Sequence, residues 1–156
     1  MCSTQHNCCV VIEKFDKDGK LPPGIHWTNW NELCGRFGWT EHRRRLLEGL
    51  KGAVENLKSA GCRFVYLDGS FVTSKETPGD FDACWDTDGV KGQLLDPVLL
   101  TFHDKRVAQK MKYFGELFPA SNLNGNSGYT FLDFFQIDKE TGDPKGIVGI
   151  DLGVGF

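Results

Sequence analysis

The sequence contains little that would place it in a membrane. No run of apolar residues approaches the roughly 20 residues that a helix needs to cross a bilayer. The opening MCSTQHNCCV also lacks the charged start and the long apolar stretch of a signal peptide. We therefore expect a cytoplasmic protein that has no membrane partner.

Paired cysteine motifs are missing as well. The chain has six cysteines, but at 156 residues it is long enough to bury a core without disulfides, which a reducing compartment disfavours. A zinc site would need CxxC spacing, and the nearest approach to one is the irregular group His6, Cys8, Cys9 and His26. Free thiols are therefore the prediction.

A large positive excess is also absent, because 18 Lys and Arg face 21 Asp and Glu and the formal charge is −3. The overall charge thus does not indicate binding to a long polyanion. The local cluster Arg43-Arg44-Arg45 lies in a predicted helix, where three adjacent side chains point in different directions. We interpret this cluster as a solvated helix face.

The length fits one domain, with residues 1–40 as an N-terminal extension packed on the core. Residues 8–15 predict a strand and residues 28–37 a short helix. Residues 41–60 predict a longer helix, because Leu46, Leu50, Val54 and Leu57 recur at spacings of four, four and three.

The second part of the chain mixes strands with one helix, and two of its strands are expected to form a hairpin around residues 139–144. The predicted strands are 63–67, 81–85, 129–137 and 146–152, and the predicted helix is 103–118. The whole pattern indicates an α/β fold with a mixed β-sheet and helices packed on one face.

The residues that indicate chemistry are Gly69-Ser70 and the pair Asp80 and Asp82. Side chains two apart on a strand share a face, so the two carboxylates should project together, about 7 Å apart at the backbone. A divalent cation would relieve their repulsion, and hard oxygen ligands suit Mg²⁺ or Mn²⁺.

A phosphate site is expected in the preceding loop. Gly69 permits close backbone approach, and the amide and hydroxyl of Ser70 are good donors to phosphate oxygens. Thr73 and Lys75 would reach the same phosphates if the loop folds over them.

This combination resembles the motif of the DNA polymerase β nucleotidyltransferase superfamily, Gly-Ser followed by about ten residues and then Asp-x-Asp. Here nine residues intervene. More narrowly, the segments GSFVTSKETPGDFDACW, FLDFFQID and PKGIVGIDL are similar to a family of small nucleotidyltransferase-like proteins from bacteria and their phages, whose activity is not settled. The resemblance covers nearly the whole chain and implies a polymerase β-like fold with a metal-dependent nucleotide site.

The resemblance also implies a third carboxylate, flanked by apolar residues on a later strand beside the Asp-x-Asp strand. Asp133 in Leu-Asp-Phe and Asp151 in Ile-Asp-Leu both fit this pattern. Asp133 is preferred, because it lies on the first long strand predicted after the intervening helix. Asp80, Asp82 and Asp133 are then the expected metal ligands and catalytic residues.

The expected activity is transfer of a nucleoside monophosphate from a nucleoside triphosphate to the hydroxyl of an unknown acceptor, which could be a protein, an RNA or a small molecule. One alternative is a non-catalytic module that binds a protein partner, such as an antitoxin or a phage-defence component. Another is a phosphate-binding protein that hydrolyses or senses nucleotides.

Overall fold

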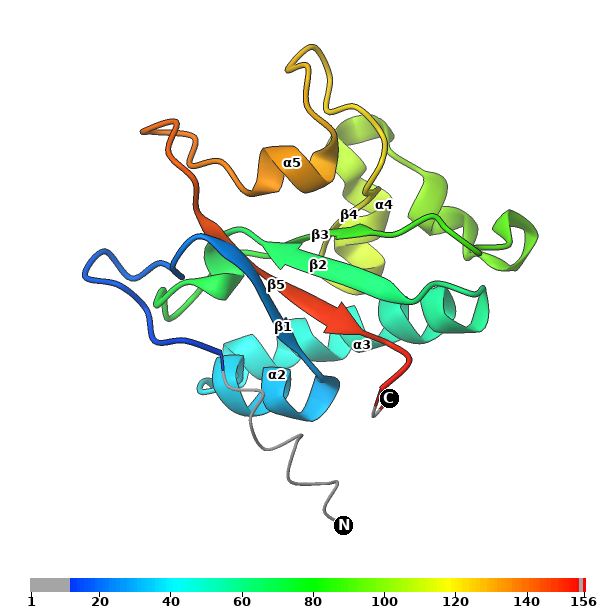
Figure 1. Ribbon diagram of the computed structural model, residues 1–156. Coiled ribbons are helices and arrows are strands. Elements are labelled where there is room, and N and C mark those ends of the chain that lie inside the picture. Colours follow the sequence, from blue (N-terminus) through cyan, green and yellow to red (C-terminus); the bar gives the residue numbers. More distant parts are fainter. Residues whose placement is uncertain (1–11, 155) are drawn as a thin grey trace.

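The computed structural model describes residues 12–154 and 156, and its framework is a mixed five-stranded sheet (Figure 1). The strands are β1 (Gly24–Thr28), β2 (Phe64–Asp68), β3 (Phe81–Trp85), β4 (Gly115–Pro119) and β5 (Gly146–Asp151). Their order in the sheet is β1-β5-β2-β3-β4. The outer pairs β1–β5 and β3–β4 are parallel, whereas β2 runs antiparallel to both of its neighbours.

Four α-helices accompany the sheet in the described part of the chain. They are α2 (Trp30–Phe37), α3 (Glu41–Ser59), α4 (His103–Tyr113) and α5 (Phe131–Phe135). Helices α2 and α3 lie on one side of the sheet and α5 on the other (Figure 1). In residues 12–154 and 156, no helix combines the length and the apolar character needed to cross a membrane.

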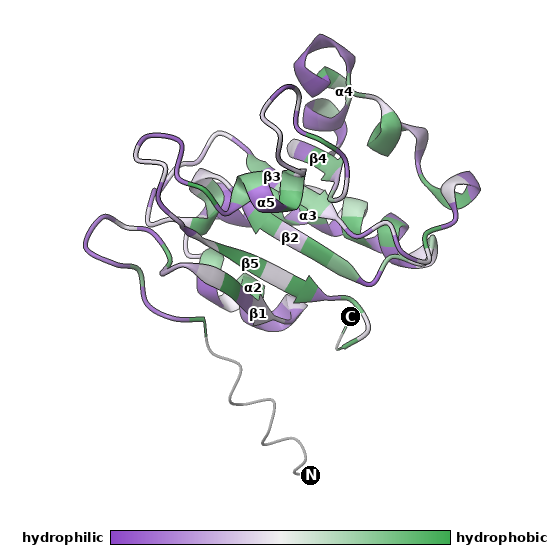
Figure 2. Ribbon diagram, turned by 45° about the horizontal axis from the view of Figure 1, so that its top comes forward, coloured by the Kyte–Doolittle hydropathy of each residue, from purple (hydrophilic) through white to green (hydrophobic). Residues whose placement is uncertain are grey.

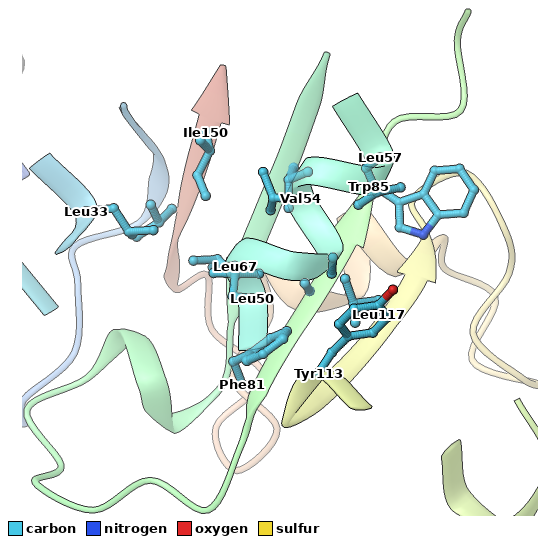
Figure 3. Close-up of a cluster of buried hydrophobic side chains, with 14 of the residues drawn as sticks. Leu33, Leu50, Val54, Leu57, Leu67, Phe81, Trp85, Tyr113, Leu117 and Ile150 are labelled. Atoms are coloured by element: carbon cyan, nitrogen blue, oxygen red, sulfur yellow. The ribbon is translucent and has the colours of Figure 1, made fainter. Parts of the chain in front are cut away.

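The main core forms where α3 meets the sheet. The predicted leucine spacing places Leu50, Val54 and Leu57 on one side of this helix, and all three are fully buried. They pack against strand residues that alternate with outward-facing ones, including Leu67 and Phe81 (Figure 3). The hydroxyl of Thr40 accepts a hydrogen bond from the amide of Arg43 and caps the helix.

A smaller cluster covers the opposite face of the sheet. It consists of Tyr66, Cys84, Ala120, Phe135 and Ile147. Because Phe135 belongs to α5, helices pack on both faces, and the expectation of helices on one face is corrected. Figure 2 shows the hydrophobic residues along the strands and hydrophilic residues in the loops that connect them.

The N-terminal strand lies later in the chain than predicted. Of the predicted strand 8–15, residues 8–11 fall outside the described residues and residues 12–15 are not in a strand. The strand is instead β1, which pairs with β5 at the edge of the sheet. The predicted helix at residues 28–37 is α2, whose cap is Asn29: its side chain accepts from the amide of Glu32.

Two predictions in the second half of the chain are wrong. The helix expected over 103–118 ends at Tyr113, because Phe114 turns into the left-handed region at φ 66° and residues 115–119 form β4. At Gly115 a Cβ would lie 2.6 Å from the ring of Phe81, so the close approach of the two strands requires glycine.

The segment 129–137 was expected to be a strand, but it contains helix α5. The side chain of Thr130 caps the N-terminus of this helix. A short antiparallel turn does join this segment to β5 around residues 139–144: Ile137 forms an isolated bridge with Pro144, and the Lys145 amide donates to the Gln136 carbonyl at 2.9 Å. The pairing is limited to this turn and does not run along β5. Both edges of β5 are taken by β1 and β2, so a third strand would have no partner.

Candidate functional site

Three carboxylates lie side by side at one end of the sheet. In the strand register Asp68 of β2 is directly opposite Asp82 of β3, and Asp82 is directly opposite Glu116 of β4. Adjacent strands are about 4.8 Å apart. Because alternate residues of these strands enter the main core, the three carboxylates share the face that α5 occupies. We call Asp68, Asp82 and Glu116 the carboxylate row.

Asp80 adds a fourth negative charge beside the row. Phe81 is fully buried in the main core, and Asp80 and Asp82 flank it in the sequence, with Asp80 one residue before β3 begins. Burial raises the pKa of Asp82 to about 7, helped by the charges of Asp80 and Glu116 and by a hydrogen bond with the Glu116 carboxyl group. Burial, followed by the charge of Glu116, also raises the pKa of Asp80.

The two ends of the row are paired with cations. Lys145 Nζ lies 2.6 Å from Asp68 Oδ1, and Arg106 Nε lies 2.5 Å from Glu116 Oε2. Asp82 is in the middle and takes part in no ion pair within the described residues. Positive side chains therefore offset the negative charge of the two end carboxylates but not that of Asp82. A cation bound at Asp82 would relieve most of the remaining repulsion.

The Gly-Ser loop packs directly against this central carboxylate. Gly69 has φ 84°, and a Cβ added there would lie 2.4 Å from Asp82 Oδ2. Only glycine fits this close approach and this backbone conformation. Ser70 then begins a single 3₁₀ turn, and Thr73 donates its hydroxyl to the Ser70 carbonyl at 2.7 Å.

A buried arginine holds the loop in place. Arg43 is fully buried, so the interpretation of Arg43-Arg44-Arg45 as a solvated face is wrong for its first member. Its guanidinium lies 3.6 Å from the ring centroid of Trp39, and burial lowers its pKa to about 10, so it stays charged at neutral pH. It donates hydrogen bonds of 2.6–3.2 Å to the backbone carbonyls of Phe37, Phe71, Thr73 and Lys75.

A pocket of about 230 Å³ opens next to Ser70, and we call it the first pocket. Gly69, Ser70, Thr73 and Asp82 line it, which brings together four of the predicted site residues. Lys75 does not line it and is exposed. The positive charge in the first pocket comes instead from Lys20, Lys139 and Lys145.

A second pocket of about 350 Å³ lies between α3, the C-terminal end of α4 and the segment that enters β3. Asp80 lines this second pocket, whereas Asp82 lines the first. The remaining wall comes from α3 and α4 and includes His42, Arg45, Lys110 and Phe114. The two aspartates of the Asp-x-Asp motif thus border two separate hollows.

The structure does not bring Asp133 to the site. The strands beside β3 are β2 and β4, whereas Asp133 is an exposed residue of helix α5. Asp151 is not there either: it pairs with Phe64, four residues or about 13 Å along β2 from Asp68, and it forms an ion pair with Arg63. The expectation of Asp133 as the third carboxylate is therefore corrected, and Glu116 occupies that place.

Sequence reasoning missed Glu116 because its segment was assigned to a helix. The signal available was Gly115-Glu-Leu-Phe-Pro119, a carboxylate before apolar residues, closed by proline. Asp68 is the last residue of its strand and is buried, although its neighbour Gly69 gives it the appearance of a turn residue.

The residues of the site offer only oxygen ligands of the kind that Mg²⁺ and Mn²⁺ take. Within residues 12–154 and 156, no three His, Cys, Asp or Glu side chains are arranged around one point in a way that could hold a metal ion. This agrees with the pairing of Asp68 and Glu116 with Lys145 and Arg106.

Fold and site together define an α/β protein in which a row of carboxylates and a Gly-Ser loop meet at one end of a mixed sheet. A family model described as "Family of unknown function (DUF6932)" matches residues 13–151. The chain belongs to this family. No curated protein and no solved structure matches the chain.

Proposed function

We propose that the protein is a metal-dependent nucleotidyltransferase with a polymerase β-like fold, which transfers a nucleoside monophosphate from a nucleoside triphosphate to an acceptor hydroxyl. The observation that carries this proposal is the cross-strand pairing of Asp82 with Glu116 beside the Gly69-Ser70 loop. It supplies a third carboxylate on a strand next to the Asp-x-Asp strand, which is the pattern that the resemblance implies.

The ligands for the metal would be Asp80, Asp82 and Glu116, whose side chains would have to move toward a common point on metal binding, because in the described residues no three such groups surround one point. Their oxygens suit Mg²⁺ or Mn²⁺, and the pKa of Asp82 is raised by burial first and then by the charges of Asp80 and Glu116, which a cation would offset. When bound, such a cation supplies charge stabilisation for the transferring phosphoryl group. Arg106 and Lys110 both contact Oε2 of Glu116, so cation binding would have to compete with two positive side chains.

The first pocket would hold the triphosphate. Ser70 offers an amide and a hydroxyl, and three lysines line the same pocket together with four acidic residues. Two of these lysines are in ion pairs with two of the acids, so the triphosphate would have to compete for them. Lys145 has a second role, because its ion pair with Asp68 holds the end of the row. Arg43 would fix the conformation of the loop that contains Ser70, because its guanidinium donates hydrogen bonds to three backbone carbonyls of this loop.

Calorimetric titration with each common nucleoside triphosphate and Mg²⁺ tests the proposal. The wild-type protein should bind one or more of them, and the Asp80→Asn/Asp82→Asn double variant should not, although it folds. Label from the α-phosphate should then appear on a component of total cellular RNA, protein or small molecules. If the folded wild-type protein gives no heat of binding with any of these triphosphates, the proposed nucleotidyltransferase function is wrong.

A non-catalytic module remains the second candidate, and one observation favours it. Both ends of the row are already neutralised by Lys145 and Arg106, so part of the acidic site is stable without a metal. A protein partner, such as an antitoxin or a phage-defence component, would then be bound by another surface. In that case partner binding survives the double aspartate substitution, whereas an enzyme loses its activity with it.

A further inference from the structure

We propose that the second pocket binds the acceptor, and that this acceptor carries a phosphate group near the hydroxyl that is modified. This inference rests on the proposed function and adds to it the chemical class of the second substrate. It is argued from the position, the charge and the size of the second pocket.

The position follows from the geometry of phosphoryl transfer. The attacking and leaving oxygens lie roughly in line on opposite sides of the phosphorus atom. Ser70 and the lysines of the first pocket lie toward β2 and β5, so a pyrophosphate leaving group held there departs on that side. The attacking hydroxyl must then come from the opposite direction, and the second pocket, which opens between α3 and the C-terminal end of α4 with Asp80 in its wall, is the hollow proposed to hold it.

The charge of the second pocket selects an anion. Its titratable wall residues are His42, Arg45, Lys110 and one acid, Asp80. Lys110 Nζ is 3.9 Å from Glu116 Oε2, so it is shared with the row, whereas Arg45 is in no ion pair within the described residues. Arg45 lies over the ring of Phe114, 4.9 Å from its centroid, which holds the guanidinium at the pocket wall.

The ring of His42 is also fixed. Its Nε2 atom donates to the carbonyl of Pro78 at 2.5 Å, two residues before Asp80. The hydrogen bond links the pocket wall on α3 to the segment that enters β3. An arginine and a lysine beside one hollow are donors that bind a phosphate ester, whereas the Nε2 proton of His42 is already donated to Pro78.

The size of the second pocket limits the part of the acceptor that enters. At about 350 Å³ it lies at the lower end of the range of small-molecule sites, roughly 300–1,000 Å³. A sugar phosphate or one terminal nucleotide fits this volume. The acceptor is therefore either a free phosphate ester or the end of a nucleic acid chain, and both present the same group to Arg45.

The transfer balances without a further reactant. The acceptor oxygen forms a bond to the α-phosphorus, and the bond from this phosphorus to the bridging oxygen of pyrophosphate breaks. Pyrophosphate leaves with the electron pair, and the hydroxyl proton is released to water. The product is a phosphodiester between the nucleotide and either the free phosphate ester or the end of the nucleic acid chain.

Arg45 and Arg44 provide a matched pair of variants for the test. Both are exposed residues of α3, but Arg44 lines a different hollow and donates to the Gly38 carbonyl. The full chain is titrated, without nucleoside triphosphate, with ribose 5-phosphate, with ribose and with a random-sequence ribonucleotide tetramer.

We expect wild type to bind ribose 5-phosphate at least about tenfold more tightly than ribose, because a charged group gains an ion-paired hydrogen bond. Arg45→Gln should weaken that binding about tenfold or more, and Arg44→Gln by less than about twofold. Tetramer binding tighter than that of ribose 5-phosphate, and equally sensitive to Arg45→Gln, supports the proposal and identifies a nucleic acid end as the source. Equal binding of ribose and ribose 5-phosphate, or equal effects of the two substitutions, overturns it.

Failure of this inference can be told apart from failure of the proposed function. If no triphosphate binds but ribose 5-phosphate still binds through Arg45, the second pocket stands as a phosphate site and the transferase function falls. If label is transferred only to acceptors that carry no phosphate, and the two arginine variants act alike, the transferase function stands and the acceptor assignment falls.

Discussion

Asp82 and Glu116 face each other across the parallel strands β3 and β4, although 34 residues separate them in the sequence (116 − 82). Parallel neighbours cannot be joined by a tight turn, so the connection runs through α4 before the chain returns to the sheet. Glu116 therefore lies on the first strand after a helix. Under the proposed function it takes the place of the third carboxylate, which the resemblance implied at Asp133.

The first prediction separates these two residues. Glu116→Gln should lower nucleotidyl transfer at least about 100-fold, because charge held by a metal supplies several kcal/mol of such a barrier. Asp133→Asn should leave the rate within about twofold, since Asp133 is exposed on α5. Initial rates of label transfer under saturating Mg²⁺ measure both. An inactive Asp133→Asn protein beside an active Glu116→Gln protein would reverse the assignment.

The second prediction concerns pH and Asp82. Its folded-state pKa of about 7 is higher than the ordinary value of 3.8, so between these values the folded protein holds a proton that the unfolded chain has lost. The free energy of unfolding should therefore fall as pH rises from about 4 to 7, by at most about 4 kcal/mol from this group. Urea unfolding without metal at several pH values in this window measures the slope.

The Asp82→Asn variant is the control for this slope. Asparagine does not ionise, so the variant should be more stable than wild type at pH 7 and should lose most of the pH dependence. Added Mg²⁺ should stabilise wild type above pH 7 and leave the variant unchanged, because binding to one state only raises stability. A slope that is the same in both proteins would contradict the assignment of the shift to Asp82.

The parts of the site that lie close in sequence could be predicted from the sequence. The Gly-Ser and Asp-x-Asp motif was enough to predict that Gly69, Ser70 and Asp82 meet at one site, whereas Asp80, expected beside Asp82 from the strand period, lines a separate pocket. Helix α3 was predicted from its leucine spacing, because one continuous face meets the sheet. In each case the feature is determined by residues that are close together in the sequence, and the tertiary structure agrees with the prediction.

The missed parts depend on contacts between distant segments. Helix α4 ends where Phe114 turns into a left-handed conformation, and nearby α3 passes so close that a Cβ at Gly49 would lie 2.2 Å from the Tyr113 carbonyl. Nothing in the local sequence predicts this close approach, so β4 and Glu116 were assigned to a helix. The burial of Arg43 depends likewise on carbonyls 28 to 32 residues away.

The third prediction concerns Gly69. In Gly69→Ala the new methyl group would meet Asp82 Oδ2 at 2.4 Å, and the positive φ of 84° is strained for alanine. We expect a loss of about 1–3 kcal/mol in the free energy of unfolding and a weaker affinity for triphosphate and Mg²⁺, because the Asp82 carboxylate must move. Gly79→Ala is the control, since a Cβ there meets nothing within 4 Å. Equal effects of the two substitutions on affinity would show that Gly69 does not position the carboxylate.

The last prediction concerns the guanidinium beneath the loop. Arg43→Met should lower the free energy of unfolding by about 3 kcal/mol or more, because four backbone carbonyls lose their donors in a buried place. Arg43→Lys should recover only part of this loss, since an ammonium group cannot reach carbonyls spread around a planar fork. Arg44→Met is the matched control: Arg44 is exposed, and its loss should change stability by less than about 0.5 kcal/mol.

Substitution of Arg43 should also affect the proposed function, because Arg43 binds the loop that contains Ser70. Of the four carbonyls, three belong to Phe71, Thr73 and Lys75, directly after Ser70. At a temperature where Arg43→Lys remains folded, its loop should be cut faster by protease, and its affinity for triphosphate should fall more than its affinity for Mg²⁺ alone. If Arg43→Lys is destabilised while the loop stays protected and triphosphate binds as in wild type, Arg43 serves the core alone and does not hold the loop.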